Sequence, residues 1–519
     1  MTPSVEPCGR KRFLTNVLWS WIGVGANLMV ALLIQRYIIR ALGEERYGIW
    51  TLVFSILDYF WFFDLGLNSA VAYFCAHYQA TGEPSRINEV INTALFYFSL
   101  AGALIVLLLL TCAHRIEALF PISAAYRADF DFLIRLTGVA WGLCIMLHMF
   151  LSALDGFQRF DLTSRVSVSV VILRSLFYLA VLRAGFGLRA MGLVCVGFQA
   201  AGYLANFRNF RGVFPGLRFS RRLVRFAVFR EIVSYGLRAF VANGSNLLLN
   251  QSGPVLTGHF LRAEFVGFLA LPSRILQNAV DAVSRIGIVT RSSSAELHAR
   301  GKRDSLLQLA IYSNRYSFAL FLPLVIFLLP YGYQFILLWV GPQYAAHSAP
   351  LLPVLLLSSA FVLAGQFNSS SVLYGLRLQG LYARGVACEA VLNVAGVALA
   401  IPRFGILGAV CVSGCLMVLV RGLYTPYLLC RALNYPLGSY LRAIYLRPAL
   451  TAAPLLALAY LWKHWLPGHT WAELIAAGSA LSMLYAVVGF FTCVERDHRA
   501  MVAGSIPLVG NRLATVLAG

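Results

Sequence analysis

The sequence carries little charge. Asp, Glu, Lys and Arg together make up 12% of its 519 residues, about half of the roughly 25% that is usual in soluble domains. Hydrophobic residues make up 59% of the chain, and the mean hydropathy is +0.74. The connections between the apolar windows are short, which leaves no room for a soluble domain. This composition predicts a membrane protein that crosses the bilayer many times.

The sequence also lacks the motifs of several chemistries. It has no Walker A motif for binding ATP phosphates and no CxxC pair among its ten cysteines. Cys411 and Cys415 share one helix face by spacing, but we interpret them as small packing residues. The longest loop expected on the outer side, residues 113–129, has no paired-carboxylate motif. We therefore expect no catalysis, no metal site, no cofactor and no disulfide framework.

The net charge of +21 needs an explanation, because in a soluble protein it would indicate nucleic-acid binding. No basic, aromatic-interleaved domain is present, and membrane proteins concentrate Lys and Arg in cytoplasmic loops. Residues 206–231 carry seven arginines and one acid, and residues 291–304 are also basic. If these loops and the N-terminus are cytoplasmic, that side collects roughly 25 Lys and Arg against roughly 10 outside. We expect both termini to be cytoplasmic and the 206–231 arginines to be a topology signal, with a partner-binding site as the alternative.

Apolar windows long enough to cross the roughly 30 Å hydrocarbon core recur along the chain and predict about fourteen helices. The first window resembles a signal peptide, but its apolar part is too long and no A-x-A-like site follows it. We expect spans near residues 13–35, 47–72, 89–112, 130–152, 163–184, 188–207, 230–252, 264–289, 306–330, 350–373, 382–401, 405–428, 444–462 and 471–492.

An internal repeat organises these spans. "LGEERYG" (42–48) aligns with "LRAEFVG" (261–267), and "AHYQATGEPS" (76–85) aligns with "AELHARGKRD" (295–304) at the same offset of 219. A repeat of six helices predicts two parallel bundles related by an axis along the membrane normal, with substrate binding between them. We predict an N-terminal six-helix lobe (1–207), a basic cytoplasmic linker (208–229), a C-terminal six-helix lobe (230–430) and two additional helices with a short cytoplasmic tail (431–519).

Some charges fall deep inside the predicted spans, where each costs about 2.5–3.5 kcal/mol on insertion scales. Other arginines, such as Arg421, fall near span ends, where snorkelling explains them. Four arginines together cost on the order of 10 kcal/mol, which favours a cationic cavity for an anionic substrate such as a pyrophosphate or a carboxylated sugar. The alternative is that the arginines form structural pairs with buried acids, but this leaves about two of the four arginines without an acidic partner. The deep arginines are Arg174, Arg238, Arg274 and Arg315, and the acids that could pair with them are Asp58 and Asp281.

Two of the quoted segments carry a family resemblance. "LGEERYGIW" (42–50), "DLGL" (64–67) and the polar loop that follows resemble the N-terminal signature of bacterial oligosaccharide flippases. These form the polysaccharide transporter branch of the multidrug/oligosaccharidyl-lipid/polysaccharide flippase superfamily. The plan of two six-helix lobes, often with two more helices, is also similar. The resemblance implies an all-α membrane protein with a MATE-like fold.

The resemblance further implies a function. A member of this branch moves a polyprenyl-pyrophosphate-linked oligosaccharide for O-antigen, capsule or exopolysaccharide across the cytoplasmic (inner) membrane, by alternating access and without ATP. Its partners would be the anionic lipid-linked substrate, membrane lipids and polysaccharide assembly proteins. The alternatives are a peptidoglycan-precursor flippase, a multidrug/cation antiporter of the same fold and a membrane glycosyltransferase or polymerase. Within this scheme we interpret Asp58 as an arginine partner or a coupling-ion site, and Asp64 as an interfacial residue at the end of its span.

Overall fold

The computed structural model describes residues 33–284, 286–376 and 378–499, and in these ranges the chain forms helices and no strand. The predicted all-α class is therefore confirmed. Most of the first predicted span, 13–35, and the end of the predicted tail lie outside the described residues. The chain divides into two compact units, Met1–Gly267 and Phe268–Gly519, which are described separately. The predicted lobe boundaries stay a prediction, because compactness does not test an internal repeat.

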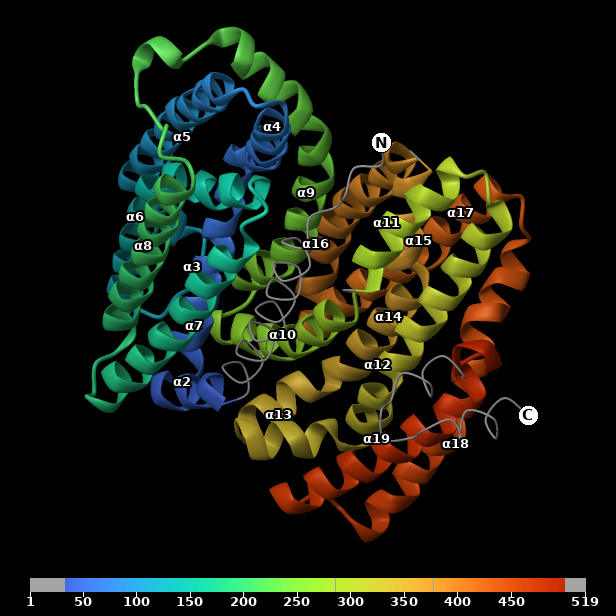
Figure 1. Cartoon of the computed structure of the whole chain (residues 1–519). Helices are drawn as coiled ribbons and strands as arrows, with labels where there is room; N and C mark the ends of the chain where they lie inside the picture. Colours follow the sequence, from blue (N-terminus) through green and yellow to red (C-terminus); the bar gives the residue numbers. More distant parts are fainter. Residues whose placement is uncertain (1–32, 285, 377, 500–519) are drawn as a thin grey trace. The chain divides into compact units, whose positions relative to one another are not determined.

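The first unit contains the helices drawn from blue to green in Figure 1. Helices α5, α6 and α8 lie side by side, and α9 packs against α3, α4 and α5. The elements are α2 (Gln35–Leu42), α3 (Glu44–Asp58), the short 3-10 helix η2 (Tyr59–Asp64), α4 (Leu67–Thr81), α5 (Pro84–Ala118), α6 (Arg127–Gly156), α7 (Phe160–Arg183), α8 (Leu188–Val213), the 3-10 turn η3 (Arg221–Leu223), α9 (Phe226–Phe260) and the start of α10 (Ala263–Ser284).

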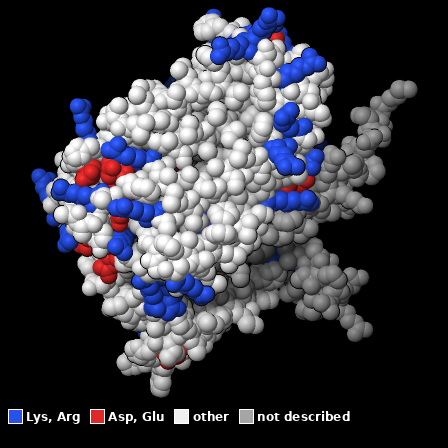
Figure 2. Space-filling model, turned by 90° about the vertical axis from the view of Figure 1, so that its left-hand side faces the viewer, with Lys and Arg blue, Asp and Glu red and all other residues white. Residues whose placement is uncertain are grey.

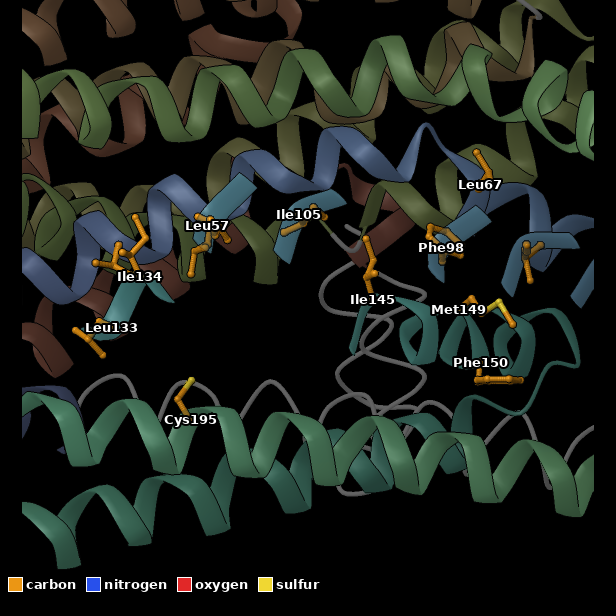
Figure 3. Close-up of a cluster of buried hydrophobic side chains, with 14 of the residues drawn as sticks. Leu57, Leu67, Phe98, Ile105, Leu133, Ile134, Ile145, Met149, Phe150 and Cys195 are labelled. Atoms are coloured by element: carbon orange, nitrogen blue, oxygen red, sulfur yellow. The ribbon is translucent and has the colours of Figure 1, made fainter. Parts of the chain in front are cut away.

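The core of the first unit is a continuous apolar cluster to which α3, α4, α5, α6 and α8 all contribute, as Figure 3 shows for residues such as Leu57, Phe98 and Ile145. Two glycines set the spacing of α5 and α6. A methyl group at Gly102 would lie 2.1 Å from the Gly142 carbonyl oxygen. Since real side chains never approach so closely, glycine at this crossing lets the two backbones touch, as small residues do between membrane helices.

The connection between α8 and α9 is held by polar side chains of α5. The Asn88 side chain accepts a hydrogen bond from the Arg218 amide (2.8 Å) and donates one to the Gly216 carbonyl (3.0 Å). One turn further on, Asn92 donates to the Arg218 carbonyl (2.7 Å) and accepts from the Ser220 amide (3.0 Å). Alternate residues of the connection thus bond to α5 as a strand bonds to its neighbour. These contacts fix the backbone while the arginine side chains stay exposed.

The second unit holds the rest of α10 and the later helices. They are α11 (Ile286–Ala299), α12 (Arg303–Trp339), α13 (Pro342–Ser348), the 3-10 turn η4 (Ala349–Leu351), α14 (Leu352–Gly365), α15 (Phe367–Gly375), α16 (Gln379–Met417), the π-helix η5 (Val418–Tyr424), α17 (Thr425–Leu433), α18 (Leu437–Trp465) and α19 (Trp471–Cys493). Gly405, with φ of +61°, interrupts α16 between the predicted spans 382–401 and 405–428.

The interior of the second unit is partly polar. Asn314 on α12 donates hydrogen bonds to Ser369 on α15 and to Tyr440 on α18, both at 2.9 Å. On α15, Asn368 donates to Ser317 (2.9 Å). These side chains are almost fully buried, so the bonds among them offset the cost of removing polar groups from water. The network ties α12, α15 and α18 together in one arrangement.

In the described residues, nine helical segments are long and apolar enough to cross a membrane, or ten if the bent pair Glu44–Asp64 and Leu67–Thr81 forms one span. The predicted number of about fourteen is therefore not confirmed, although a multi-pass membrane protein is. On the face that Figure 2 shows, a broad uncharged area lies between groups of charged side chains near its margins. Such a band is what a bilayer requires of a surface in contact with its hydrocarbon core.

Candidate functional site

The second predicted span is broken. Leu65 and Gly66, within "DLGL", have φ of 48° and 75°, which are both left-handed. Two such residues in succession end the helical hydrogen-bond ladder. The chain therefore bends by 47° between η2 and α4. The expectation of one helix over 47–72 was wrong, because hydropathy does not register a local backbone break.

Asp64 holds the start of α4 after this break. Its Oδ1 accepts hydrogen bonds from the Asn68 backbone amide (3.1 Å) and from the Asn68 side chain (2.6 Å). The Ser152 hydroxyl on α6 donates a hydrogen bond to the side-chain carbonyl oxygen of the same Asn68 (3.1 Å). A carboxylate in this position satisfies an amide that the helix start leaves unpaired. Asp64 is thus the last residue of the helical segment before the break, and its interpretation as an interfacial residue at the end of its span stays a prediction.

Helix α9 passes directly against the break. A methyl group at Gly66 would lie 2.2 Å from the Gly236 carbonyl oxygen, and one at Gly236 would lie 2.8 Å from the Leu65 carbonyl oxygen. Next to this crossing, the rings of Tyr73 on α4 and Tyr235 on α9 stack with their centroids 4.5 Å apart. The two glycines bring the backbones into contact, so the break and α9 form one rigid frame.

Beside this frame lies a cavity of about 420 Å³, within the roughly 300–1,000 Å³ typical of small-molecule sites. It lies wholly within the first unit, between η2 with the start of α4 and the middle of α9. Asp64 is the one ionisable side chain among the described residues that line it. The lining residues are Trp61, Phe62, Asp64, Gly66, Asn68, Ser69, Phe240, Asn243, Gly244, Asn246, Leu247 and Asn250.

Three asparagines of α9 face this cavity. Asn243, Asn246 and Asn250 are spaced by three and four residues, which places them on one side of the helix. Within the part of the chain that the structure describes, the side-chain amides of Asn243 and Asn250 have no hydrogen-bond partner, and both residues are exposed. Each amide can donate and accept at once. The cavity therefore presents neutral hydrogen-bonding groups that no described protein group occupies.

Aromatic rings complete the cavity wall. The Trp61 indole is braced by edge contacts to Trp141 and His148 on α6, at centroid distances of 4.9 and 4.7 Å. Phe62 meets Phe240 of α9 edge to face at 5.8 Å. Rings held in this way lose little further conformational freedom when a ligand packs against them.

Asp58, at the end of α3, is half-buried and accepts a hydrogen bond from the Gln251 side chain of α9 (2.8 Å). Gln251 directly follows the last asparagine that lines the cavity. The structure thus places Asp58 at the α3–α9 contact, close in sequence to the cavity walls on both helices. Its predicted role as an arginine partner or coupling-ion site stays a prediction.

Arg174, midway along α7, is half-buried, and its Nε is buried without a hydrogen-bond partner. Its guanidinium carbon lies 6.0 Å from the centroid of the Tyr178 ring, within reach of a cation–π attraction. In the described residues no acid pairs with it. Arg174 does not line the asparagine-rich cavity, so the structure does not join it to that site.

Three other predicted residues are not among the described residues that line this cavity. Arg238 is on α9, two residues after Gly236, but its side chain lies outside the described residues. Arg274 and Asp281 are exposed on the α10 segment of the second unit. Asp281 accepts a hydrogen bond from Gln277 (2.8 Å). The structure therefore does not test whether these three bind substrate.

Arg315, the fourth predicted arginine, is buried in the second unit and already has partners. Its guanidinium donates to Glu495 (2.9 Å), just beyond α19, and to the Ala443 carbonyl of α18 (2.8 Å). Arg447 shares the same carboxylate (2.9 Å). The Arg315 hydrogen bond holds the pKa of Glu495 below its usual range. Glu495 was not predicted as a partner, because it lies beyond the last predicted span.

A second buried ion pair was missed. The Arg421 Nε donates to both carboxylate oxygens of Glu389, at 2.9 and 2.8 Å, and the two side chains are 13% and 2% exposed. Arg421 lies on the π-helix η5, inside a helical stretch that runs from Gln379 to Leu433. The expectation that snorkelling accounts for Arg421 was wrong, because its guanidinium is paired with a buried acid, while its position near a span end stays a prediction. Glu389 is the lone acid in the apolar sequence 379–401, and this signal could have indicated the ion pair.

Comparison with known proteins gives one family match and two relatives at the level of sequence. Residues 13–291 match the family described as "Polysaccharide biosynthesis protein". A putative O-antigen transporter from Shigella flexneri is 22% identical over 427 residues, which cover 80% of this chain and 98% of that protein. The uncharacterized membrane protein EpsK from Bacillus subtilis is 22% identical over 508 residues, which cover 93% of this chain and 97% of that protein.

Solved structures show the same fold. The Lipid II flippase MurJ in an inward closed conformation has a TM-score of 0.69 at 12% identity, with 91% of this chain and 99% of that chain covered. An inward-facing multidrug resistance MATE family transporter of the MOP superfamily has a TM-score of 0.62 at 14% identity, with 78% and 95% covered. The predicted MATE-like fold is therefore confirmed.

Proposed function

Because the chain belongs to the polysaccharide biosynthesis protein family, we propose that it is a flippase. It moves a polyprenyl-pyrophosphate-linked oligosaccharide, used for O-antigen, capsule or exopolysaccharide, across the cytoplasmic membrane. The family match over residues 13–291 carries this proposal. The near full-length similarity to a putative O-antigen transporter supports it. A flippase transfers its substrate between leaflets unchanged, so the chain is not an enzyme.

The mechanism we propose is alternating access, with both termini cytoplasmic. The two lobes of the predicted repeat would expose the substrate site first to one side and then to the other, as in other transporters built from repeats. The basic connection between α8 and α9 supports this orientation, because its arginines are exposed on a fixed backbone. Assembly proteins for the polysaccharide are the partners that this role implies.

Arg174 is the arginine that the structure favours most as a ligand for the substrate pyrophosphate. A guanidinium at this depth is expensive to bury, and here its Nε has no hydrogen-bond partner. A phosphate would supply both charge and two acceptor oxygens in the geometry of the guanidinium fork. Arg238 and Arg274 remain further proposed ligands, and Arg315 would have to give up Glu495 to join them. Asp58 remains the proposed coupling residue.

A peptidoglycan-precursor flippase is the second candidate. The Lipid II flippase MurJ shares the fold, with a TM-score of 0.69, but at 12% identity that likeness does not carry its function over to this chain. A multidrug/cation antiporter of the same fold is less well supported, because the family match is to polysaccharide proteins. The two flippase functions differ in cargo and can therefore be separated by substrate.

Reconstitution tests the proposal directly. Purified protein in liposomes should expose a labelled polyprenyl-pyrophosphate oligosaccharide, extracted from the organism that carries this chain, to the opposite leaflet. Labelled lipid II in the same vesicles is the comparison. Faster flipping of the oligosaccharide than of lipid II supports the proposal. Flipping of lipid II alone would replace it with the second candidate, and flipping of neither would contradict both.

A further inference from the structure

We propose that the asparagine-rich cavity of the first unit binds the uncharged sugar portion of the substrate. This inference rests on the proposed function and gives it a subsite. The cavity is the space of about 420 Å³ between η2 with the start of α4 and the middle of α9. The pyrophosphate would then bind elsewhere, so that sugar and phosphate are recognised by separate groups.

The charge of the described cavity lining does not favour the phosphate end of the substrate. Asp64 is the one ionisable side chain among the described residues that line it, and no Lys or Arg is among them. Its carboxylate would repel a pyrophosphate, and in a region of low dielectric that repulsion is stronger than in water. A carboxylate does accept hydrogen bonds from hydroxyl groups. The cavity therefore suits a neutral, hydroxyl-rich ligand.

The amide groups fit the hydrogen bonding of a sugar. A sugar hydroxyl both donates and accepts, and so does an asparagine amide. Asn243 and Asn250 have free amides in the described part of the chain. They lie seven residues apart on one helix face, or about 10 Å along its axis. That distance allows contact with more than one sugar ring of an oligosaccharide.

Trp61 supplies the apolar half of such a site. One face of a sugar ring carries mainly C–H groups, which pack against an aromatic ring. The Trp61 indole is held at a centroid distance of 4.9 Å from Trp141 and 4.7 Å from His148. A ring already fixed on the cavity wall costs little entropy on binding. Amides on one wall and a braced indole on the other match the two sides of a sugar ring.

The first experiment measures binding without transport. The glycan is released from the extracted lipid by mild acid, so that it carries no phosphate, and is titrated calorimetrically into the full-length protein in nanodiscs. The wild type should bind it saturably. Asn243→Leu/Asn250→Leu, which keeps the side-chain shape, should bind at least about tenfold more weakly, a difference of about 1.4 kcal/mol. Gln79→Leu, which removes an exposed amide of α4 outside the cavity, should bind like the wild type.

Three results would overturn the proposal. The first is equal glycan affinity in the wild type and the double variant, and the second is no saturable binding by the wild type. The third is binding of inorganic pyrophosphate that the double variant weakens as much as it weakens glycan binding. The flipping assay stands apart from these titrations. Wild-type vesicles that bind the glycan but do not flip the lipid would contradict the proposed function and leave the sugar site intact.

Discussion

Removing the carboxylate of Glu389 should destabilise the second unit strongly. In Glu389→Ala the Arg421 guanidinium, only 13% exposed, loses the group that accepts its Nε hydrogen bond. Breaking a buried pair by removing one partner costs about 3–5 kcal/mol, because the remaining charge is left buried. At about 2–4 °C per kcal/mol for a unit of this size, the melting temperature should fall by roughly 6 °C or more.

Replacing both partners should remove most of that loss. In Glu389→Met/Arg421→Met, no charge is left buried, and pairs of apolar residues often match a buried ion pair in stability. Melting can be followed as the fraction of monodisperse protein that survives heating in detergent. Glu296→Ala is the control, since Glu296 and Arg300 form an exposed pair and its loss should change melting by about 2 °C or less.

The reasoning would be refuted if Glu389→Ala had the same melting temperature as the control Glu296→Ala. It would also be refuted if Glu389→Met/Arg421→Met were no more stable than Glu389→Ala. The first result would mean that the guanidinium reaches water or another acceptor. The second would mean that the pair contributes through its specific geometry rather than through the cost of a buried guanidinium that has lost its carboxylate.

Three further predictions concern other parts of the chain. Arg174→Ala and Arg274→Ala should each abolish surface glycan while the protein stays in the membrane. Normal surface glycan in both variants would contradict the proposed cationic site. Gly66→Ala should lower the melting temperature or prevent folding, because the new methyl would meet the α9 backbone at 2.2 Å with φ of +75°; wild-type melting would contradict that contact. Since the pKa of Glu495 is lowered in the folded state by Arg315, its ionised form stabilises the protein at neutral pH. Glu495→Gln should therefore melt lower than the wild type at neutral pH, and the gap should close as the pH falls below about 4.5; a constant gap would contradict the ion pair.

The apolar pattern predicted the general plan because burial in a bilayer depends on composition along a span. The aligned segments "LGEERYG" and "LRAEFVG" meet in the structure, where a methyl at Gly48 would lie 1.9 Å from the Ala263 carbonyl oxygen. The break at Leu65–Gly66 was not predicted, because the hydropathy of a leucine is the same whether its backbone is left-handed or helical. Its backbone is decided by the contact with α9.

The partners of the charged residues could not be predicted from the sequence. Arg421 pairs with an acid 32 residues away, and Arg315 with one 180 residues away. Spacing along a helix cannot indicate such contacts, because they depend on how helices pack. The asparagine-rich cavity did leave a signal. Asn243, Asn246 and Asn250 share one face of a predicted span, and uncharged polar residues in such a position indicate a site as the arginines do.

The hydrogen bonds that Asn88 and Asn92 make to residues 216–220 have a practical consequence. A chain segment with seven arginines between residues 206 and 231 would ordinarily be cut quickly by trypsin. A protease must bind its substrate as a free extended strand, and here the backbone amides and carbonyls around Arg218 are already taken by α5. Cleavage at Arg218 should therefore report detachment of the segment from α5, which makes limited trypsin digestion a simple gauge of movement at the α8–α9 connection.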